Sequence, residues 1–256
     1  MPTEVCLVTG AGSGIGRAAA IALARNGTGV AALDLDHAQA NQTASMIANG
    51  GRSTAIEADA SSEEPMDEAI QQTMGHFGGL DSVVVNARIN GTWAPIDDLH
   101  ADEWDRTMRM NLTSTYVTLN KTVPCLKANG GGSIVIVSSI NGTWTFTNPG
   151  ATAYSATKAA QVAIAQQLAL ELARFAIRIN VVCPGAIDTK ISDRTEVRHP
   201  ERTEVPVIWP QGSVPIRPGE PGRPEDVADL MLFPLSERRH IKGTPTFING
   251  GDGVLR

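Results

Sequence analysis

The stretch Thr9-Gly10-Ala11-Gly12-Ser13-Gly14-Ile15-Gly16 follows the apolar run Val5-Cys6-Leu7-Val8 and leads into the alanine-rich segment 17–24. The apolar run predicts a buried strand, and the alanine-rich segment predicts a helix. Glycines let the backbone turn tightly and approach a ligand without a Cβ in the way. The helix N-terminus offers unpaired N–H groups and a positive dipole end to a pyrophosphate. The stretch therefore predicts a phosphate-binding turn or, alternatively, a tight strand-to-helix corner.

Outward from this turn, short apolar segments alternate with helical patterns. Such alternation is typical of a parallel sheet covered by helices on both faces. Expected strands are 5–9, 29–34, 53–57, 82–86, 133–138, 178–183 and 246–248. Expected helices are 38–49, 63–76, 101–128 with a break at Pro124, 154–175 and 225–235. The predicted fold class is α/β, a doubly wound parallel sheet in a single domain spanning residues 1–256.

Composition bounds the class of protein. The 256 residues, 42% hydrophobic and 19% charged, suit one large globular domain. The net charge of −6 and the lack of Lys/Arg runs give no reason to expect nucleic-acid binding. Residues 1–4 lead directly into a strand, and no apolar run approaches the roughly 20 residues that span a bilayer. We expect a soluble cytoplasmic protein with no signal peptide and no membrane partner.

The three cysteines, Cys6, Cys125 and Cys183, lie far apart in apolar contexts. They form no CxxC pair and no metal-ligand spacing with the histidines. We expect buried free thiols, a reducing compartment and no metal site.

Asp34 closes the second apolar stretch, 30–33. A carboxylate there can accept hydrogen bonds from the adenosine ribose hydroxyls of a dinucleotide. A 2′-phosphate would meet a like charge, at a cost of about 4 kcal/mol per unit pair at 4 Å and an effective dielectric near 20. That cost outweighs any gain from Arg17, and Leu35 and Asp36 add no positive charge. Asp34 favours NAD over NADP, unless it merely ends a strand.

Tyr154 and Lys158 are four residues apart, so they share one helix face. A tyrosine hydroxyl has a reference pKa near 10, too high for a base at neutral pH. A nearby ammonium and an oxidised nicotinamide would stabilise the phenolate and lower that pKa. The pair predicts a general acid/base, although such pairs also occur on plain helix surfaces.

Together these segments resemble the short-chain dehydrogenase/reductase family. Residues 9–16 match its TGxxxGxG turn, and Pro184-Gly185 matches its PG motif. Its catalytic tetrad is matched by Asn111, Ser139, Tyr154 and Lys158. The resemblance implies a Rossmann-like sheet of about seven strands. It also implies a homotetramer that packs through the helices 101–128 and 154–175.

The same resemblance implies the cofactor contacts. They are Gly10, Ser13, Gly14, Ile15, Gly16, Asp34, Asp59, Ala60, Asn86, Ala87, Tyr154, Lys158, Pro184, Gly185, Ile187 and Thr189. In the family, an aspartate at the position of Asp59 binds the adenine amino group, whereas a helix cap is the plain alternative. Ile187 and Thr189 match positions that bind the carboxamide of the cofactor.

Within the tetrad, the resemblance assigns a substrate-orienting hydroxyl to Ser139. Fifteen positions separate it from Tyr154, about two more than is usual, so Ser138 is the fallback. The resemblance also implies that Asn111 supports a water-linked proton relay from Lys158, with a helix-kink asparagine as the alternative.

Arg88 departs from the family pattern. It follows Asn86-Ala87, where the family has glycine. If that position needs a left-handed backbone, arginine costs at least roughly 1–2 kcal/mol. Its side chain would also crowd the nicotinamide ribose.

Residues 189–223 form the longest aperiodic segment and contain six prolines. We expect a substrate-binding loop or lid, or else a surface excursion that packs against a neighbouring subunit. Aromatic residues of the loops after three strands either wall the substrate pocket or pack the lid closed. The expected pocket residues are Trp93, Ser139, Asn141, Trp144 and Trp209, with Phe146 nearby.

The sequence therefore predicts an NAD-dependent oxidoreductase that interconverts a secondary alcohol and a ketone. One alternative is a 3-oxoacyl-thioester reductase, a class that usually draws on NADPH and is disfavoured by Asp34. The other is a catalytically weak NAD-binding sensor or scaffold, favoured by Arg88 and disfavoured by the intact tetrad.

Overall fold

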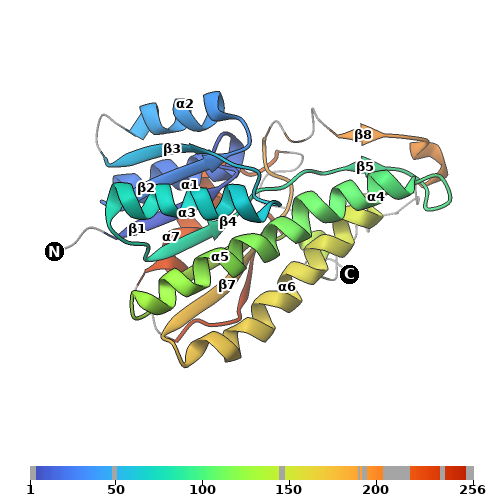
Figure 1. Ribbon diagram of the computed structural model, residues 1–256. Coiled ribbons are helices and arrows are strands. Elements are labelled where there is room, and N and C mark those ends of the chain that lie inside the picture. The colour runs from blue at the N-terminus through green and yellow to red at the C-terminus, as the bar shows by residue number, and fades with distance from the viewer. Residues whose placement is uncertain are drawn as a thin grey trace.

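Seven parallel strands form one twisted sheet in the order β3-β2-β1-β4-β6-β7-β9 (Figure 1). The computed structural model describes residues 4–47, 51–143, 148–189, 191, 195–203, 220–236 and 240–251. The sheet strands are β1 Val5–Thr9, β2 Gly29–Asp34, β3 Ser53–Glu57, β4 Ser82–Val85, β6 Gly132–Val137, β7 Ile177–Pro184 and β9 Pro245–Ile248. Every expected strand is present, with bounds shifted by at most one residue.

Helices make the crossover connections that parallel strands need. They are α1 Gly14–Arg25, α2 His37–Ile47, α3 Glu63–Phe77, α4 Ala101–Met108, α5 Ser114–Ala128, α6 Thr152–Ala173 and α7 Pro224–Leu235. Each expected helix is found, which confirms the α/β class and the doubly wound sheet.

Helices cover both faces of the sheet. On one face α1, α2 and α7 bury alternate strand residues such as Cys6 and Val8. On the other face α3, α5 and α6 cover Leu7, Val83 and their neighbours. In Figure 1, α5 and α6 lie in front of the sheet, and α1 and α7 lie behind it. Burial on both faces explains why the strands are continuous apolar runs rather than alternating ones.

The strand order reverses between β1 and β4. The chain adds β2 and β3 on one side of β1 and then crosses to β4 on the other side. The loops that follow β1 and β4 therefore leave the sheet in opposite directions and open a crevice at its carboxyl edge. Ligands of doubly wound folds bind at such a switch point.

The region 101–128 corrects one expectation. The helix does not break at Pro124, which lies inside α5. The interruption comes earlier, at a π-helical turn, Arg109–Thr113, between α4 and α5. A π-turn inserts an extra residue into the helix and needs no proline or glycine, so no breaker residue marks it in the sequence.

A second small sheet was not expected. The two-residue strands β5 (Thr92–Trp93) and β8 (Glu196–Val197) pair in parallel, followed by a 3-10 turn at Pro200–Arg202. In Figure 1 they lie side by side beyond the carboxyl edge of the main sheet. Two residues are too few to show a period, so sequence patterns cannot reveal this pair.

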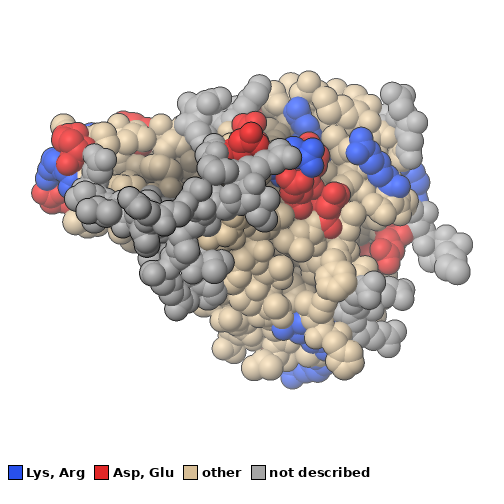
Figure 2. Space-filling model, turned by 180° about the vertical axis from the view of Figure 1, so that it is seen from behind, with Lys and Arg blue, Asp and Glu red and all other residues tan. Residues whose placement is uncertain are grey.

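The surface carries mixed charge. On the face shown in Figure 2, acidic and basic side chains are interspersed, and the parts of it that are described hold no broad basic patch. None of the described helices is long and apolar enough to cross a membrane. The cysteines are free thiols, and Cys6 and Cys183 are buried in β1 and β7.

Candidate active site at the carboxyl edge of the sheet

The turn between β1 and α1 is shaped by its glycines. Gly10 has φ +64°, and a Cβ there would come within 2.9 Å of the Ala87 Cα. A Cβ on Gly16 would collide with the carbonyl oxygen of Gly10. Ser13 precedes α1 in an extended conformation, and its side chain makes no capping hydrogen bond. The first N–H groups of α1, from Gly14 onward, therefore keep no side-chain cap and can receive an anion.

Asn86 and Ala87 support this turn from behind. The Asn86 side chain donates to the carbonyl oxygens of Thr9 (3.1 Å) and Gly10 (3.2 Å). The Thr9 hydroxyl accepts from the N–H groups of Asn86 (2.9 Å) and Ala87 (3.1 Å). These four bonds join the ends of β1 and β4 across the switch point and fix the shape of the turn.

Asp34 lies at the end of β2, against the same turn. Its Oδ2 accepts from the Gly12 N–H at 2.8 Å, and its Oδ1 accepts from the Asp36 N–H at 3.1 Å. The side chain is half-buried. A carboxylate thus stands beside the glycine-rich turn, and its contact with an adenosine ribose stays a prediction.

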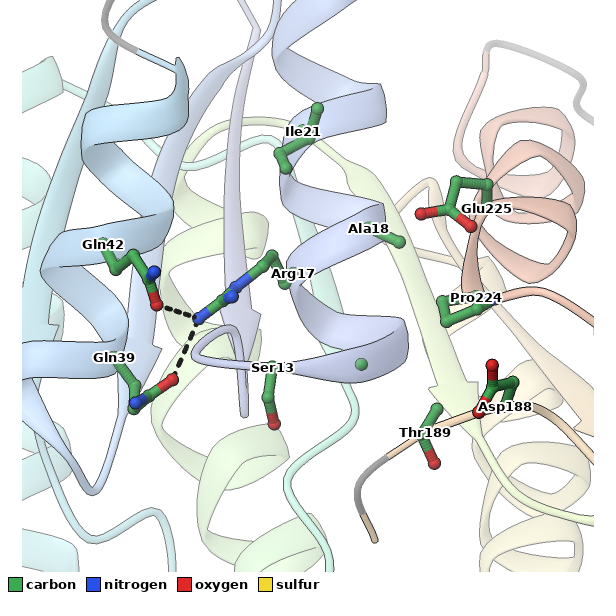
Figure 3. Close-up of a pocket in the computed structure, with 11 residues that line it drawn as sticks. Ser13, Arg17, Ala18, Ile21, Gln39, Gln42, Asp188, Thr189, Pro224 and Glu225 are labelled. Carbon is green, nitrogen blue, oxygen red and sulfur yellow. Dashed lines mark hydrogen bonds between the residues drawn. The ribbon is translucent and has the colours of Figure 1, made fainter.

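Arg17 lines a cavity of about 690 Å³ on the outer side of α1 (Figure 3). Its guanidinium lies between α1 and α2 and donates to Gln39 and Gln42, both at 2.9 Å. It also donates to the Gly12 carbonyl oxygen. These uncharged acceptors hold the guanidinium between α1 and α2.

Asp59 serves as a local cap. Its Oδ1 accepts from the N–H (2.9 Å) and hydroxyl (2.6 Å) of Ser61, and its Oδ2 pairs with Arg109 at 2.7 Å. Burial acts to raise the pKa of Asp59, but the hydrogen bonds from Ser61 and Arg109 lower it overall. The turn-capping interpretation accounts for these contacts. Ala60 is buried beside Asp59, and an adenine contact by either residue stays a prediction.

A second cavity, of about 440 Å³, brings most of the other predicted residues together. It is lined by Ile15, Arg88, Asn90, Trp93, Ser138, Ser139, Ile140, Asn141, Asn148, Tyr154, Pro184, Gly185, Ala186, Ile187, Asp188, Thr189, Ile191 and Pro221. Residues from the loops after β1, β4, β6 and β7 thus meet in one space. Asp34 and Asp59 lie toward the opposite end of the sheet edge, after β2 and β3.

The two serines after β6 have different partners. Ser138 donates to the Lys158 carbonyl oxygen at 2.8 Å, so its hydroxyl is committed to α6. Ser139 accepts from the Asn141 N–H at 3.2 Å and lies 3.5 Å from the Pro184 carbonyl oxygen, a weak contact. The Ser139 hydroxyl is therefore the one with hydrogen-bonding capacity left for a ligand. This geometry favours Ser139 over the fallback Ser138.

Lys158 is fully enclosed, with no exposed surface. Its Nζ donates to the carbonyl oxygen of Val137 and to Oε1 of Gln161, both at 3.0 Å. It lies 5.5 Å from the ring centroid of Tyr154. Burial lowers the pKa of Lys158 well below its usual value, and the nearby Arg88 adds to that effect.

Asn111 lies in the π-helical turn and is fully buried. Its carboxamide pairs with the backbone of Ile89, accepting from the N–H at 2.8 Å and donating to the carbonyl at 2.9 Å. Its own carbonyl oxygen accepts from Nε2 of Gln161 at 3.1 Å. Asn111 is thus joined to Lys158 through the Gln161 side chain.

Arg88 projects into the cavity that Tyr154 lines. Its Nη1 donates to the Asn86 side chain at 3.1 Å, whereas its buried Nε has no hydrogen-bond partner in the described part of the chain. The only described non-glycine residues with positive φ are Ala176 and His199. Arg88 therefore carries no left-handed backbone strain, and the expected cost of 1–2 kcal/mol does not apply. Crowding by the side chain is what distinguishes it from glycine.

The segment after β7 supplies the opposite wall. The Gly185 N–H donates to the Ile248 carbonyl oxygen at 3.0 Å, and Ile187 bridges to Gly222. Thr189 borders both cavities, and its buried hydroxyl has no hydrogen-bond partner among the residues that the structure describes. Buried hydroxyls are nearly always paired, so this one is available for a ligand.

Among the expected pocket residues, Trp93 and Asn141 line the cavity. The Trp93 indole donates to the Asn90 carbonyl oxygen at 3.2 Å, which fixes its ring. Trp144, Phe146 and Trp209 lie outside the described residues. Within the described part of the chain, no three His, Cys, Asp or Glu side chains are grouped as metal ligands.

Sequence reasoning missed Gln161. The one available signal was a polar residue three positions after Lys158 and seven after Tyr154, on the same face of the helix. It also missed Arg198, which ties the segment 195–203 to Asp98 (3.0 Å) and Glu103 (2.9 Å). No local pattern marks a contact between residues about 100 positions apart.

Comparisons with known proteins indicate the same family as the sequence motifs. The sequence model of the short chain dehydrogenase family matches residues 4–199. A (3R)-3-hydroxyacyl-CoA dehydrogenase from Canis lupus familiaris is 36% identical over 259 residues, which cover 97% of this chain and 96% of that protein.

Two solved structures are similar over nearly the whole chain. A 3-ketoacyl-ACP reductase from Sinorhizobium meliloti 1021 is 59% identical with a TM-score of 0.94, covering 99% of this chain and 100% of that one. A 3-ketoacyl-(acyl-carrier-protein) reductase from Brucella melitensis, complexed with NADH, is 29% identical with a TM-score of 0.84 and covers 98% of each chain. The protein belongs to the short-chain dehydrogenase/reductase family.

Proposed function

We propose that the protein is an NAD-dependent oxidoreductase that interconverts a secondary alcohol and a ketone, with Tyr154 as general acid/base. The observation that carries the proposal is the cavity lined by both Tyr154 and Ser139, with Lys158 Nζ 5.5 Å from the centroid of the tyrosine ring. A substrate oxygen in that cavity can reach a proton acceptor and a hydrogen-bond donor at once.

The residues present fit a nicotinamide dinucleotide. The uncapped start of α1 suits a pyrophosphate, and the unpartnered Thr189 hydroxyl suits a carboxamide. The carboxylate of Asp34 suits the adenosine ribose hydroxyls. When bound, the nicotinamide ring supplies the hydride acceptor or donor of the reaction.

Tyr154 takes the proton of the alcohol oxygen during oxidation and returns it during ketone reduction. Lys158 stabilises the phenolate form of Tyr154 by its positive charge. Ser139 orients the substrate oxygen by donating to it, because its hydroxyl has only weak contacts within the protein. Lys158 itself has no exposed surface, so it reaches a cofactor ribose only if neighbouring side chains such as Arg88 move.

We infer that NAD is preferred over NADP. The Asp34 carboxylate borders the glycine-rich turn, and Arg17 is occupied by Gln39, Gln42 and a backbone carbonyl. A 2′-phosphate near Asp34 would meet a like negative charge. The NADH in the related Brucella melitensis structure supports the same inference.

A second candidate narrows the substrate to a 3-hydroxyacyl or 3-oxoacyl thioester. It is favoured by the names of the similar (3R)-3-hydroxyacyl-CoA dehydrogenase and 3-ketoacyl-ACP reductase. A catalytically weak NAD-binding sensor remains the third candidate. It is favoured by Arg88, whose guanidinium occupies the proposed substrate and nicotinamide end of the site.

One assay separates these candidates. The purified protein is incubated with NAD or NADP and a panel of secondary alcohols, polyols and 3-hydroxyacyl thioesters, while reduced-cofactor absorbance is followed. The proposal expects NAD to exceed NADP at least about tenfold in kcat/KM, as the like-charge cost predicts. Turnover of thioesters alone would support the second candidate, and cofactor binding without turnover would support the sensor.

Four wider expectations complete the proposal. We propose a single domain in which the described parts of 189–223 border the substrate cavity. We also propose a homotetramer and a cytoplasmic location, and we expect small-molecule substrates rather than nucleic acids or membranes as partners. Gel filtration with light scattering would test the oligomeric state.

A further inference from the structure

The side chain of Gln161 is an amide buried in α6, with 1% of the residue exposed. Its Oε1 accepts from Lys158 Nζ at 3.0 Å. Its Nε2 donates to the Asn111 carbonyl oxygen at 3.1 Å and to the Thr115 hydroxyl at 2.9 Å. An ammonium can only donate and a carbonyl can only accept, so these partners fix which end of the amide carries the oxygen. The Gln161 side chain therefore has one orientation.

The π-helical turn sets the position of the partner carbonyl. Arg109–Thr113 forms this widened turn, and the Asn111 carbonyl oxygen within it also accepts from the Thr115 hydroxyl at 2.8 Å. Turns of this kind are frequent at functional sites. The Asn111 carboxamide is held by Ile89 at the same time, so the carbonyl cannot shift away from Gln161 without breaking buried bonds.

Lys158 depends strongly on this contact. Within the described residues its ammonium has two hydrogen-bond acceptors, the Val137 carbonyl and Gln161, and neither carries a charge. The titratable or charged groups that face it are Tyr154 on its own helix, Arg88 after β4 and Cys183 on β7. Arg88 repels the ammonium, so the neutral acceptors must hold it in place.

We propose that Gln161 is a positioning residue of the reaction, which fixes the Lys158 ammonium near the Tyr154 ring and joins it directly to the Asn111 carbonyl. This proposal rests on the proposed function. An amide N–H does not release its proton at neutral pH, so the link orients Lys158 without carrying protons to Asn111. A buried lysine with one lost acceptor would lose its charge more readily, and it would then stabilise the Tyr154 phenolate less well.

Two substitutions separate this role from simple space filling. Gln161→Leu keeps most of the volume but has no polar atom. Gln161→Ala leaves a small space lined by the Lys158 ammonium, the Asn111 carbonyl and the Thr115 hydroxyl, and three polar partners are enough to hold a water molecule.

We expect kcat of the leucine variant to fall about tenfold or more and KM to change little. The pH at which kcat rises should move to a higher value. The alanine variant is expected within about threefold of the parent, because water replaces the amide. A space-filling role predicts the reverse order, since alanine leaves the larger cavity. That reverse order, or a leucine variant with unchanged kcat and pH profile, would overturn the proposal.

A readout without cofactor or substrate keeps this test independent of the proposed function. The chain has five lysines, so their side-chain signals in labelled protein can be followed by NMR during a pH titration. Lys158→Met assigns the signal of Lys158. We expect the pKa of Lys158 to be lower in the leucine variant than in the parent, whatever substrate the protein uses. An equal pKa would contradict the proposal even if the assay on alcohols finds no turnover at all.

Discussion

At the scale of single residues, Tyr154 and Lys158 share a helix face but differ in access. Tyr154 is 8% exposed and lines the substrate cavity, whereas Lys158 has no exposed surface. A ligand in the cavity can therefore touch Tyr154, whereas Lys158 lies behind it and out of reach. The division suits the proposed roles, in which Tyr154 exchanges the proton and Lys158 stabilises the phenolate without meeting the substrate.

Tyr154→Phe tests the acid/base role. The phenyl ring fills the same space but cannot exchange a proton, so kcat should fall by roughly 10² to 10⁴. NAD binding, measured by calorimetry, should stay close to that of the parent. An unchanged rate would remove Tyr154 from the reaction, and lost NAD binding would point to a structural role.

Arg88→Gly tests whether the guanidinium crowds the cofactor. Backbone strain is not at issue, because Arg88 does not have positive φ. Removing the side chain opens the space beside Lys158 and removes a positive charge that repels the Lys158 ammonium. NAD should therefore bind several-fold more tightly, a gain in binding free energy on the order of 1 kcal/mol. Calorimetric titration of NAD measures this.

Arg88→Met is the matched control, because it keeps much of the bulk and removes the charge. If only the glycine variant binds more tightly, bulk is responsible; if both do, charge is responsible. Weaker binding by the glycine variant would mean that Arg88 contacts the cofactor or the substrate favourably.

At the scale of elements, the sequence predicted what local chemistry determines and missed what distant contacts determine. Apolar runs revealed all seven strands of the main sheet, because parallel strands are buried on both faces. The glycine-rich turn and the pair Tyr154/Lys158 were likewise visible as local spacing. The π-turn at Arg109–Thr113 was not, since helix insertions carry no breaker residue and Pro124 was the more conspicuous signal.

The pair β5 and β8 depends on such a distant contact. Arg198, next to β8, donates to Asp98 at 3.0 Å and to the two oxygens of Glu103, both at 2.9 Å. The hydrogen bond from Arg198, together with one from the His100 N–H, lowers the pKa of Glu103 from 4.5 to about 2. This cluster fastens the segment 195–203 beside the cavity.

Glu103→Gln tests whether the ion pair with Arg198 stabilises the fold, because the effect of the substitution on stability should depend on pH. A lowered pKa in the folded state means that the ionised carboxylate stabilises the fold above about pH 4.5 and loses this effect as the pH falls toward about 2. The melting temperature of the variant should thus lie below that of the parent at pH 7, and the gap should narrow toward pH 3. Scanning calorimetry across this range measures it.

Glu201→Gln serves as the control, because Glu201 is an exposed glutamate of the same segment that pairs with His199. Its melting temperature should follow that of the parent at every pH. A constant gap for Glu103→Gln would show that shape, rather than charge, matters at that position.

At the scale of the whole molecule, the site spans the carboxyl edge of the sheet. Asp34 lies at the end of β2, and the cavity of Tyr154 lies beyond β4 and β6. A ligand that reaches both regions must contact loops from both halves of the doubly wound sheet. Such a ligand stabilises the domain as a unit, because unfolding either half releases it.

NAD should therefore raise the melting temperature. At 100 times Kd, ligand binding adds about 2.7 kcal/mol, which corresponds to an upward shift of roughly 5–10 °C for a domain of this size. NADP at the same concentration should give a much smaller shift because of Asp34. Asp34→Ala should bring the two shifts closer together, and equal shifts with the parent protein would refute the cofactor preference.

Alkylation of the buried thiols can report when the sheet opens. Burial raises the pKa of Cys6 and of Cys183 to about 12, so neither is a thiolate while the strands stay closed. Cys125, half-buried on α5, should react first with an alkylating reagent, and mass spectrometry after timed quenching would reveal the order. If the sheet opens only as a whole, Cys6 and Cys183 should then be alkylated at one common rate, and NAD should slow both equally. Faster labelling of Cys183 than of Cys6 would mean that β7, the strand beside the cavity, opens locally before the centre of the sheet does.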